Sequence, residues 1–205
     1  MKLLITEFRS ALMFITILPA GKSPAYSPMG MIRCFPLVGL TLGALLVLVD
    51  QFVSLFWPAG PAAVLDTLFL VVITGAFHLD GLGDTADGMF SHRPRDRVLE
   101  IMKDSRIGMM GLVAVVGVLA MKVVGIYAMK TTLSMDKLVV LFLIVPAYAR
   151  ASMIFGIKWM SYGRKGTGTG LDLFERPLGA RDFVFFIPPV LISLVLGYSG
   201  LVLNT

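Results

Sequence analysis

Apolar residues follow one another in long runs along most of this chain, and short polar segments separate the runs. Five runs stand out, at residues 35–57, 62–77, 107–129, 138–157 and 183–203. A helix that crosses a bilayer takes about 20 mostly apolar residues, and each run approaches or reaches that length. The pattern therefore predicts an all-α fold, a polytopic transmembrane helix bundle with about five spans.

A further apolar stretch at residues 3–18 differs from these runs, because Glu7 and Arg9 lie inside it. Charged residues within an otherwise apolar helix favour a position in the membrane interface over a full crossing. We expect an N-terminal interfacial or re-entrant helix here. Together with the spans it would form a single integral membrane domain over residues 1–205.

The composition supports a membrane protein, since 57% of the residues are hydrophobic and only 15% are charged. Soluble domains carry about 25% charged residues. The single cysteine, Cys34, excludes an internal disulfide framework. A net charge of +5 indicates loop orientation rather than binding of nucleic acid. Membrane lipid is the expected partner, and a bundle this small could also associate as a homo-oligomer.

Lysine and arginine are concentrated in three of the polar segments. Residues 2–33, 78–106 and 158–182 contain 4, 5 and 5 of them, whereas residues 58–61 contain none and residues 130–137 contain two. Cytoplasmic loops of membrane proteins carry the excess of basic residues. We therefore expect the N-terminus and both long polar loops, 78–106 and 158–182, to face the cytoplasm.

An acidic segment follows the second apolar run, with the sequence His78-Leu-Asp-Gly-Leu-Gly-Asp-Thr-Ala-Asp-Gly88. Its aspartates, Asp80, Asp84 and Asp87, are spaced i, i+4 and i+7, which places them on one face of an α-helix. Three ionised carboxylates on one face repel each other unless a cation lies among them. Carboxylate oxygens suit hard cations, and the spacing therefore predicts a Mg²⁺ site.

A second polar segment begins at a turn, and its pattern predicts a short helix from Pro94 to about Ser105. Asp96, Glu100 and Asp104 would share one face of it, although Asp96 could simply pair with a neighbouring arginine. Glu100 and Asp104 could join the first acids around one metal ion. The candidates for holding the anionic oxygens of a substrate phosphate are Lys103, Ser105 and Arg106, with Arg150 in the cytoplasmic half of the fourth span.

Carboxylates for a metal ion, beside cations for phosphate, are typical of phosphoryl or nucleotidyl transfer. Mg²⁺ would neutralise charge that develops on a leaving phosphate. One of the carboxylates, or His78, would accept the proton of an attacking hydroxyl. A lone histidine at a helix boundary is more often a hydrogen-bonded neighbour than a base, so both roles stay open for His78.

The two acidic segments resemble a known family. His78 to Gly88, and Leu99-Glu-Ile-Met-Lys-Asp-Ser-Arg-Ile-Gly108, are similar to the signature of bacterial cobalamin synthases, also called adenosylcobinamide-GDP ribazoletransferases. Phe35-Pro-Leu-Val-Gly39 and Phe14-Ile-Thr-Ile-Leu-Pro19 resemble the N-terminal region of that family, and the resemblance covers roughly Phe8 to Arg150. Members are usually longer and carry a further motif resembling G-G-x-T-G-D-x-L-G-A. This sequence lacks it, which leads us to expect a truncated sequence or a short variant.

The resemblance implies a Mg²⁺-dependent transferase, multi-pass in the bacterial cytoplasmic (inner) membrane, with its active site facing the cytoplasm. A hydroxyl of α-ribazole, or of its 5′-phosphate, would attack the pyrophosphate of adenosylcobinamide-GDP. GMP would leave, and adenosylcobalamin or its 5′-phosphate would form. Asp80, Asp84, Asp87 and Asp104 fall on the acidic motif positions of the family.

Two other functions stay open. The acid spacing is also similar to that of CDP-alcohol phosphatidyltransferases, which would release CMP. Their D-G-x-x-A-R order is absent from this segment. A cation transporter could use the three aspartates of the first segment as an ion site. Transport sites tend to lie near the membrane midplane on broken helices, whereas these acids are expected at a membrane surface.

Overall fold

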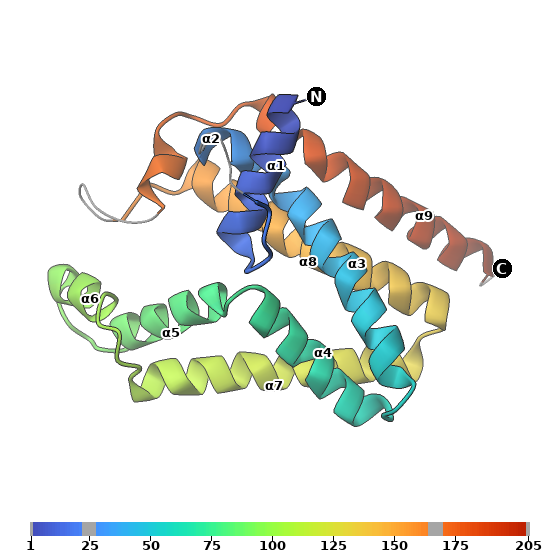
Figure 1. Ribbon diagram of the computed structural model, residues 1–205. Helices are drawn as coiled ribbons and strands as arrows, with labels where there is room; N and C mark the ends of the chain where they lie inside the picture. Colours follow the sequence, from blue (N-terminus) through green and yellow to red (C-terminus); the bar gives the residue numbers. More distant parts are fainter. Residues whose placement is uncertain (1, 22–27, 164–169, 204–205) are drawn as a thin grey trace. The chain divides into compact units, whose positions relative to one another are not determined.

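The computed structural model describes residues 2–21, 28–163 and 170–203, and these residues form helices and no strand (Figure 1). The α-helices are α1 (Lys2–Ile15), α2 (Pro28–Met31), α3 (Phe35–Ser54), α4 (Ala59–Ile73), α5 (Phe77–Met89), α6 (Arg95–Ile101), α7 (Met109–Thr132), α8 (Met135–Trp159) and α9 (Ile187–Leu203). Short 3₁₀ helices are η1 (Ile32–Cys34), η2 (Leu171–Phe174) and η3 (Ala180–Phe186). The all-α prediction is confirmed.

Three helical segments are long and apolar enough to cross a membrane, namely Pro28–Ser54, α7 and α8. A fourth crossing results if α4 and α5, which meet at a bend of 88°, count as one broken span or re-entrant segment. The expected fifth span corresponds to α9, whose 17 residues extend about 26 Å, less than a bilayer core of about 30 Å. The described helices thus support a polytopic membrane protein with three or four spans, where the sequence suggested about five.

The bend between α4 and α5 comes from two consecutive residues with positive φ. Gly75 has a φ of 57° and Ala76 a φ of 55°. Glycine adopts this left-handed conformation readily, whereas an alanine in it costs roughly 1–2 kcal/mol. The pair ends α4 and lets α5 begin at Phe77 in a new direction. The first part of the polar segment 78–106 therefore lies on a helix, as the spacing of its aspartates predicted.

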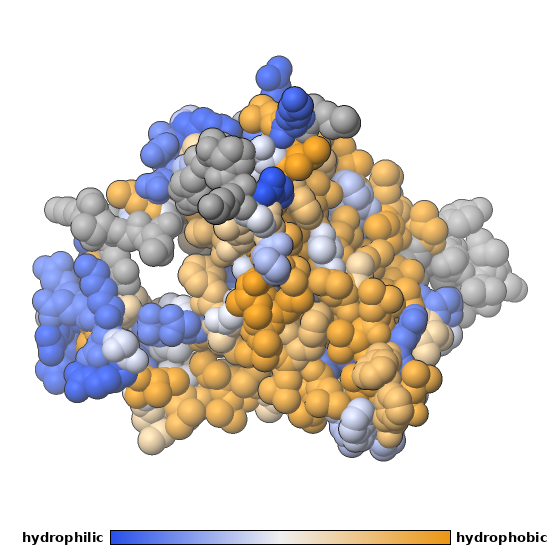
Figure 2. Space-filling model, in the orientation of Figure 1, coloured by the Kyte–Doolittle hydropathy of each residue, from blue (hydrophilic) through white to orange (hydrophobic). Residues whose placement is uncertain are grey.

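The chain divides into two compact units, which we describe separately. The central unit contains Val53–Thr132, and the terminal unit contains Met1–Phe52 and Leu133–Thr205. In the central unit, α4 and α5 both pack along α7 (Figure 1). Figure 2 shows mostly hydrophobic side chains over α4 and α7, whereas hydrophilic side chains gather over α6.

A buried ion pair joins α4 to α7 within the central unit. Asp66 is fully buried, and the side chain of Lys130 is only 5% exposed. The ammonium nitrogen of Lys130 lies 3.5 Å from a carboxylate oxygen of Asp66 and 2.9 Å from the hydroxyl of Ser54. An isolated buried charge is strongly unfavourable, so Asp66 and Lys130 can both stay buried only as a pair.

The terminal unit contains a close crossing of α3 and α8. A Cβ atom on Gly39 would overlap the backbone of Ala147, and one on Gly43 would overlap the backbone of Leu143. Only glycine therefore allows the two helices to approach this closely. Small and apolar residues fill the surrounding core, among them Ala11, Ile15, Phe35, Val38, Ala151 and Ile154.

Candidate active site

The three aspartates of the acidic segment lie on α5, in the central unit. Since α5 is one continuous helix over Phe77–Met89, Asp80, Asp84 and Asp87 share one side of it, as the spacing predicted. Asp80 is exposed, and Asp84 and Asp87 are half-buried. His78 is exposed at the start of α5, and its ring lies edge-on to that of Phe77 with the ring centres 5.4 Å apart.

Small residues let α5 approach its neighbours. A Cβ on Gly83 would come into ordinary contact with Val115 of α7, and one on Gly88 would overlap the side chain of Met102. A Cβ on Gly81, by contrast, would meet none of the described atoms within 4 Å. Gly88 thus serves close packing, whereas the space at Gly83 would accept a Cβ and Gly81 lies on an open side of α5.

Asp87 binds the start of α7. Its Oδ2 accepts a hydrogen bond from the backbone N–H of Gly108 at 2.7 Å, and its Oδ1 accepts one from Gly111 at 2.8 Å. Amides in the first turn of a helix have no partner within the helix and carry partial positive charge, so an ionised carboxylate suits them. A Cβ on either glycine would overlap the carboxylate. Sequence reasoning missed this contact; its only local signal is the pair of glycines beside the start of an apolar helix.

The second acidic segment folds differently from the prediction. Helix α6 ends at Ile101, so Asp104 lies outside it, and the shared face of Asp96, Glu100 and Asp104 is wrong for Asp104. The carboxylate of Asp104 accepts a hydrogen bond from the backbone N–H of Arg106 at 3.1 Å. A side chain that bonds the backbone two residues ahead competes with helix formation, which accounts for the turn at this position.

The acids of this segment have cationic partners of their own. Arg106 donates hydrogen bonds from its guanidinium to Asp104 at 2.6 and 3.0 Å. These bonds lower the pKa of Asp104 to about 2 and raise the pKa of Arg106. Glu100 accepts a hydrogen bond from Arg97 at 2.5 Å on the exposed side of α6. Both pairs lie in contact with solvent, where such ion pairs contribute little to stability.

The expected metal ligands do not form one compact cluster. Within the described part of the chain, no three histidine, cysteine, aspartate or glutamate side chains lie close enough together to hold a metal ion. Asp80 and Asp84 are nevertheless one helical turn apart. One or two carboxylates, completed by substrate phosphates, are the usual protein contribution to a Mg²⁺ site. The donors on α5 suit a hard cation, and the metal roles of Asp80, Asp84, Asp87, Glu100 and Asp104 stay predictions.

The expected phosphate-binding residues fall into both units. Lys103, Ser105 and Arg106 are exposed and lie in the turn between α6 and α7. Arg150 lies on α8 of the terminal unit. Its Nε is buried and has no hydrogen-bond partner among the described residues.

Comparisons with known proteins agree with the family resemblance. The family model for cobalamin-5-phosphate synthase matches residues 7–204. An adenosylcobinamide-GDP ribazoletransferase of Acetivibrio thermocellus is 35% identical over 173 residues, which cover 82% of this chain and 66% of that protein. A protein of the same name from a Roseiflexus species is 34% identical over 194 residues, covering 93% of this chain and 70% of that protein.

A higher identity is found over a shorter region. An adenosylcobinamide-GDP ribazoletransferase of Escherichia coli is 46% identical over 122 residues, which cover 57% of this chain and 49% of that protein. The chain thus spans between 49% and 70% of the length of these relatives. No solved structure matches the chain. Because the family model extends over nearly all of its residues, the chain belongs to the cobalamin-5-phosphate synthase family.

Proposed function

We propose that the chain transfers the adenosylcobinamide phosphate group of adenosylcobinamide-GDP to α-ribazole, or to its 5′-phosphate, and releases GMP. The observation that carries this proposal is helix α5, which places Asp80, Asp84 and Asp87 along one side, next to the basic turn before α7. Relatives that are 34–35% identical to this chain bear the name adenosylcobinamide-GDP ribazoletransferase. Acids beside cations suit chemistry at a pyrophosphate.

Asp80 and Asp84 are the residues that we expect to hold Mg²⁺. They lie four residues apart on α5, where two carboxylates repel each other unless a cation lies between them. When bound, Mg²⁺ would neutralise charge on the pyrophosphate oxygens. Asp87 has a different task, because its two oxygens already accept hydrogen bonds from α7. It orients α5 and thereby the two carboxylates.

The turn between α6 and α7 supplies the cations for the substrate phosphates. Lys103 and Arg106 are exposed there, and the ion pair with Asp104 holds the guanidinium of Arg106 in a defined place. A guanidinium fits phosphate oxygens in a bidentate manner, whereas an ammonium acts as a point charge. Ser105, between them, adds a hydroxyl donor. These groups would orient the pyrophosphate for attack.

In the reaction, the phosphate attached to cobinamide loses its bond to GMP and forms a bond to ribazole. The ribazole hydroxyl oxygen forms a bond to the phosphorus nearest the cobinamide, and the bond from that phosphorus to the bridging oxygen breaks. GMP departs with the electron pair of the broken bond. The hydroxyl proton passes to a base, for which Asp80 and His78, both exposed on α5, are the candidates.

The orientation of the protein also belongs to this proposal. Residues 78–106 and 158–182 carry ten of the 18 lysines and arginines, which favours a cytoplasmic position for both segments in a bacterial inner membrane. A nucleotide-bearing substrate would then reach the acidic helix from the cytoplasm.

The test supplies the purified chain in detergent with adenosylcobinamide-GDP, α-ribazole and Mg²⁺, and measures nucleotides by chromatography. We expect GMP that depends on Mg²⁺ and that falls by roughly a hundredfold or more in Asp84→Asn. Asp96→Asn, which removes an exposed carboxylate of α6, should retain the rate. The Escherichia coli relative serves as the positive control. No GMP from this chain beside an active relative, or CMP from a CDP-alcohol substrate instead, would refute the proposal.

A further inference from the structure

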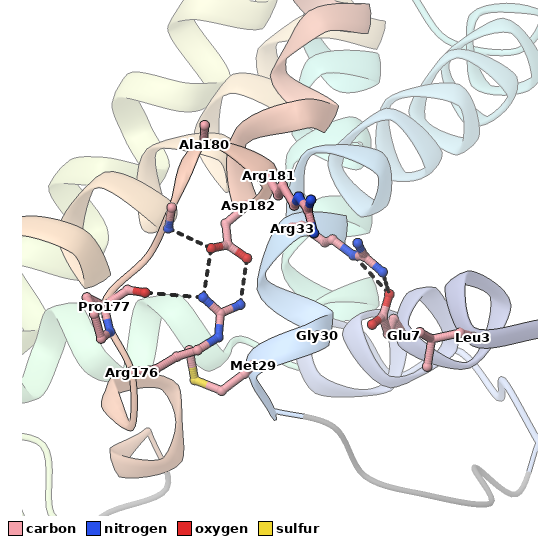
Figure 3. Close-up of a pocket in the computed structure, with 11 residues that line it drawn as sticks. Leu3, Glu7, Met29, Gly30, Arg33, Arg176, Pro177, Ala180, Arg181 and Asp182 are labelled. Atoms are coloured by element: carbon pink, nitrogen blue, oxygen red, sulfur yellow. Dashed lines mark hydrogen bonds and ion pairs between the residues drawn. The ribbon is translucent and has the colours of Figure 1, made fainter.

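The terminal unit contains a hollow of about 720 Å³ that is rich in charge (Figure 3). Helices α1 and α2 and the segment leading into η3 supply its walls. Its charged residues are Glu7, Arg33, Arg176, Arg181 and Asp182. The volume lies within the range of roughly 300–1,000 Å³ that is typical of ligand pockets. Three arginines face two carboxylates, so the lining carries an excess of positive charge.

Two ion pairs fix the walls of this basic hollow. Arg33 donates a hydrogen bond from Nε to Glu7 at 2.9 Å, which ties η1 to α1. Arg176 donates two hydrogen bonds to Asp182, at 2.8 and 3.0 Å, which tie the approaching segment to η3. Figure 3 shows both pairs on the rim of the same space. Their carboxylates are neutralised within the protein and leave the third arginine uncompensated.

That third arginine, Arg181, is the available cation. It is exposed and has no hydrogen-bond or ion-pair partner within the described ranges 2–21, 28–163 and 170–203. Arg33, although paired with Glu7, keeps further guanidinium N–H donors, since an arginine has five of them. The hollow can thus offer donors from two arginines to an anionic group.

An apolar groove continues from the basic hollow. A second space of about 540 Å³ shares Arg33, Ala180 and Arg181 with the first and extends along Phe183, Val184 and Ile187. Val184 is 42% exposed and Ile187 is 55% exposed, at the point where η3 passes into α9. The combined space is therefore basic at one end and apolar at the other.

Aromatic and basic side chains surround the apolar groove. Phe155, Trp159, Phe183 and Phe186 form ring contacts with centres 4.9 to 5.9 Å apart, and the ammonium of Lys158 lies 4.9 Å from the ring centre of Phe183. Phe155, Lys158 and Trp159 lie at the end of α8, which is long and apolar enough to cross a membrane, and the other two rings belong to η3. Aromatic residues and lysines of this kind concentrate at the level of the lipid headgroups.

We propose that the basic hollow and its apolar groove bind one anionic phospholipid of the membrane. The lipid phosphate accepts hydrogen bonds from Arg181 and Arg33, and one acyl chain lies along Phe183, Val184 and Ile187. Charge complementarity selects an anionic headgroup over a zwitterionic one. The site uses residues of the terminal unit and goes beyond the transfer reaction proposed for the central unit.

The experiment measures lipids retained by the whole chain in detergent, by native mass spectrometry. Phosphatidylglycerol and phosphatidylcholine with identical acyl chains are the probes. We expect phosphatidylglycerol to bind at least about five times more tightly than phosphatidylcholine. This is the gain in affinity that one basic residue near a membrane surface provides. Arg181→Gln should abolish this preference. Arg93→Gln removes the same charge from an exposed position of the central unit and should preserve it.

A second variant tests the shape of the site without changing a charge. Ala180 lines both spaces, so Ala180→Phe should fill their junction and weaken the binding of phosphatidylglycerol. Circular dichroism confirms that each variant is folded. Equal retention of the two lipids by the wild-type chain, or an equal effect of Arg181→Gln and Arg93→Gln, would overturn the proposal. Displacement of phosphatidylglycerol by millimolar inorganic pyrophosphate would indicate a site for soluble phosphates and would also overturn it.

Discussion

Replacing Asp87 with asparagine separates a role in packing from a role in metal binding. The ionised carboxylate accepts the N–H groups of both Gly108 and Gly111. An asparagine side chain offers one acceptor oxygen and an NH₂ group that can only donate. At least one amide at the start of α7 therefore loses its acceptor in partly buried surroundings.

The magnitude follows from these two bonds. A hydrogen bond to a charged group contributes roughly 1.5–3 kcal/mol, and a capping side chain at a helix N-terminus contributes roughly 0.5–2 kcal/mol. Asp87→Asn retains one of the two bonds and loses the charge that the helix N-terminus favours. We expect the free energy of unfolding to fall by about 2 kcal/mol, and by about 3 kcal/mol in Asp87→Ala, which leaves both amides without an acceptor.

Unfolding by sodium dodecyl sulfate, followed by far-ultraviolet circular dichroism in mixed micelles, measures the effect. Asp80→Asn is the matched control, because Asp80 is exposed and has no hydrogen-bond or ion-pair partner in the described part of the chain. We expect that control to stay within about 0.5 kcal/mol of the wild-type chain. If Asp87→Asn unfolds at the same detergent fraction as Asp80→Asn, the packing role assigned to Asp87 is refuted.

Three further predictions concern other contacts. Lys130→Met should destabilise the chain by about 3 kcal/mol by leaving Asp66 buried and unpaired, and Asp66→Asn in the same chain should recover much of the loss; a double-mutant cycle of unfolding free energies checks this. Ala76→Gly should stabilise by about 1 kcal/mol in the same assay, and a loss of stability would contradict the left-handed conformation. Arg106→Gln should raise the pKa of Asp104 from about 2 toward its usual value near 4, as carboxyl ¹³C chemical shifts would report. Because folding lowers the pKa of Asp104, the contribution of its ion pair with Arg106 to stability is present above about pH 4 and disappears as the pH falls toward 2. An unchanged pKa of Asp104 in Arg106→Gln would refute this prediction.

Patterns that depend on neighbouring residues could be predicted from the sequence. The apolar runs located α3, α7 and α8, because a helix with apolar residues on all sides is stable mainly in a bilayer. The spacing of Asp80 and Asp84 predicted a shared helix face, because helical periodicity is local. The family resemblance rested on the same local motifs, and the comparison with known proteins confirmed it.

Features that depend on tertiary contacts could not be predicted. The bond from Asp87 to Gly111 joins residues that are 24 positions apart, and no local pattern separates it from metal binding. The left-handed Ala76 has no signature, since alanine normally favours a helix, and its effect is to bend the chain between α4 and α5. The basic hollow likewise combines Arg33 and Arg181, which are remote in the sequence.

Binding of Mn²⁺ in place of Mg²⁺ tests the central claim most directly. Electron paramagnetic resonance would measure free Mn²⁺ during titration of the detergent-solubilised chain in the presence of adenosylcobinamide-GDP. We predict that Asp80→Asn and Asp84→Asn each weaken Mn²⁺ binding by roughly tenfold or more, whereas the folded fraction of Asp87→Asn, which keeps both of these carboxylates, binds Mn²⁺ more tightly than either variant. Unchanged Mn²⁺ affinity in Asp80→Asn and Asp84→Asn would contradict the account.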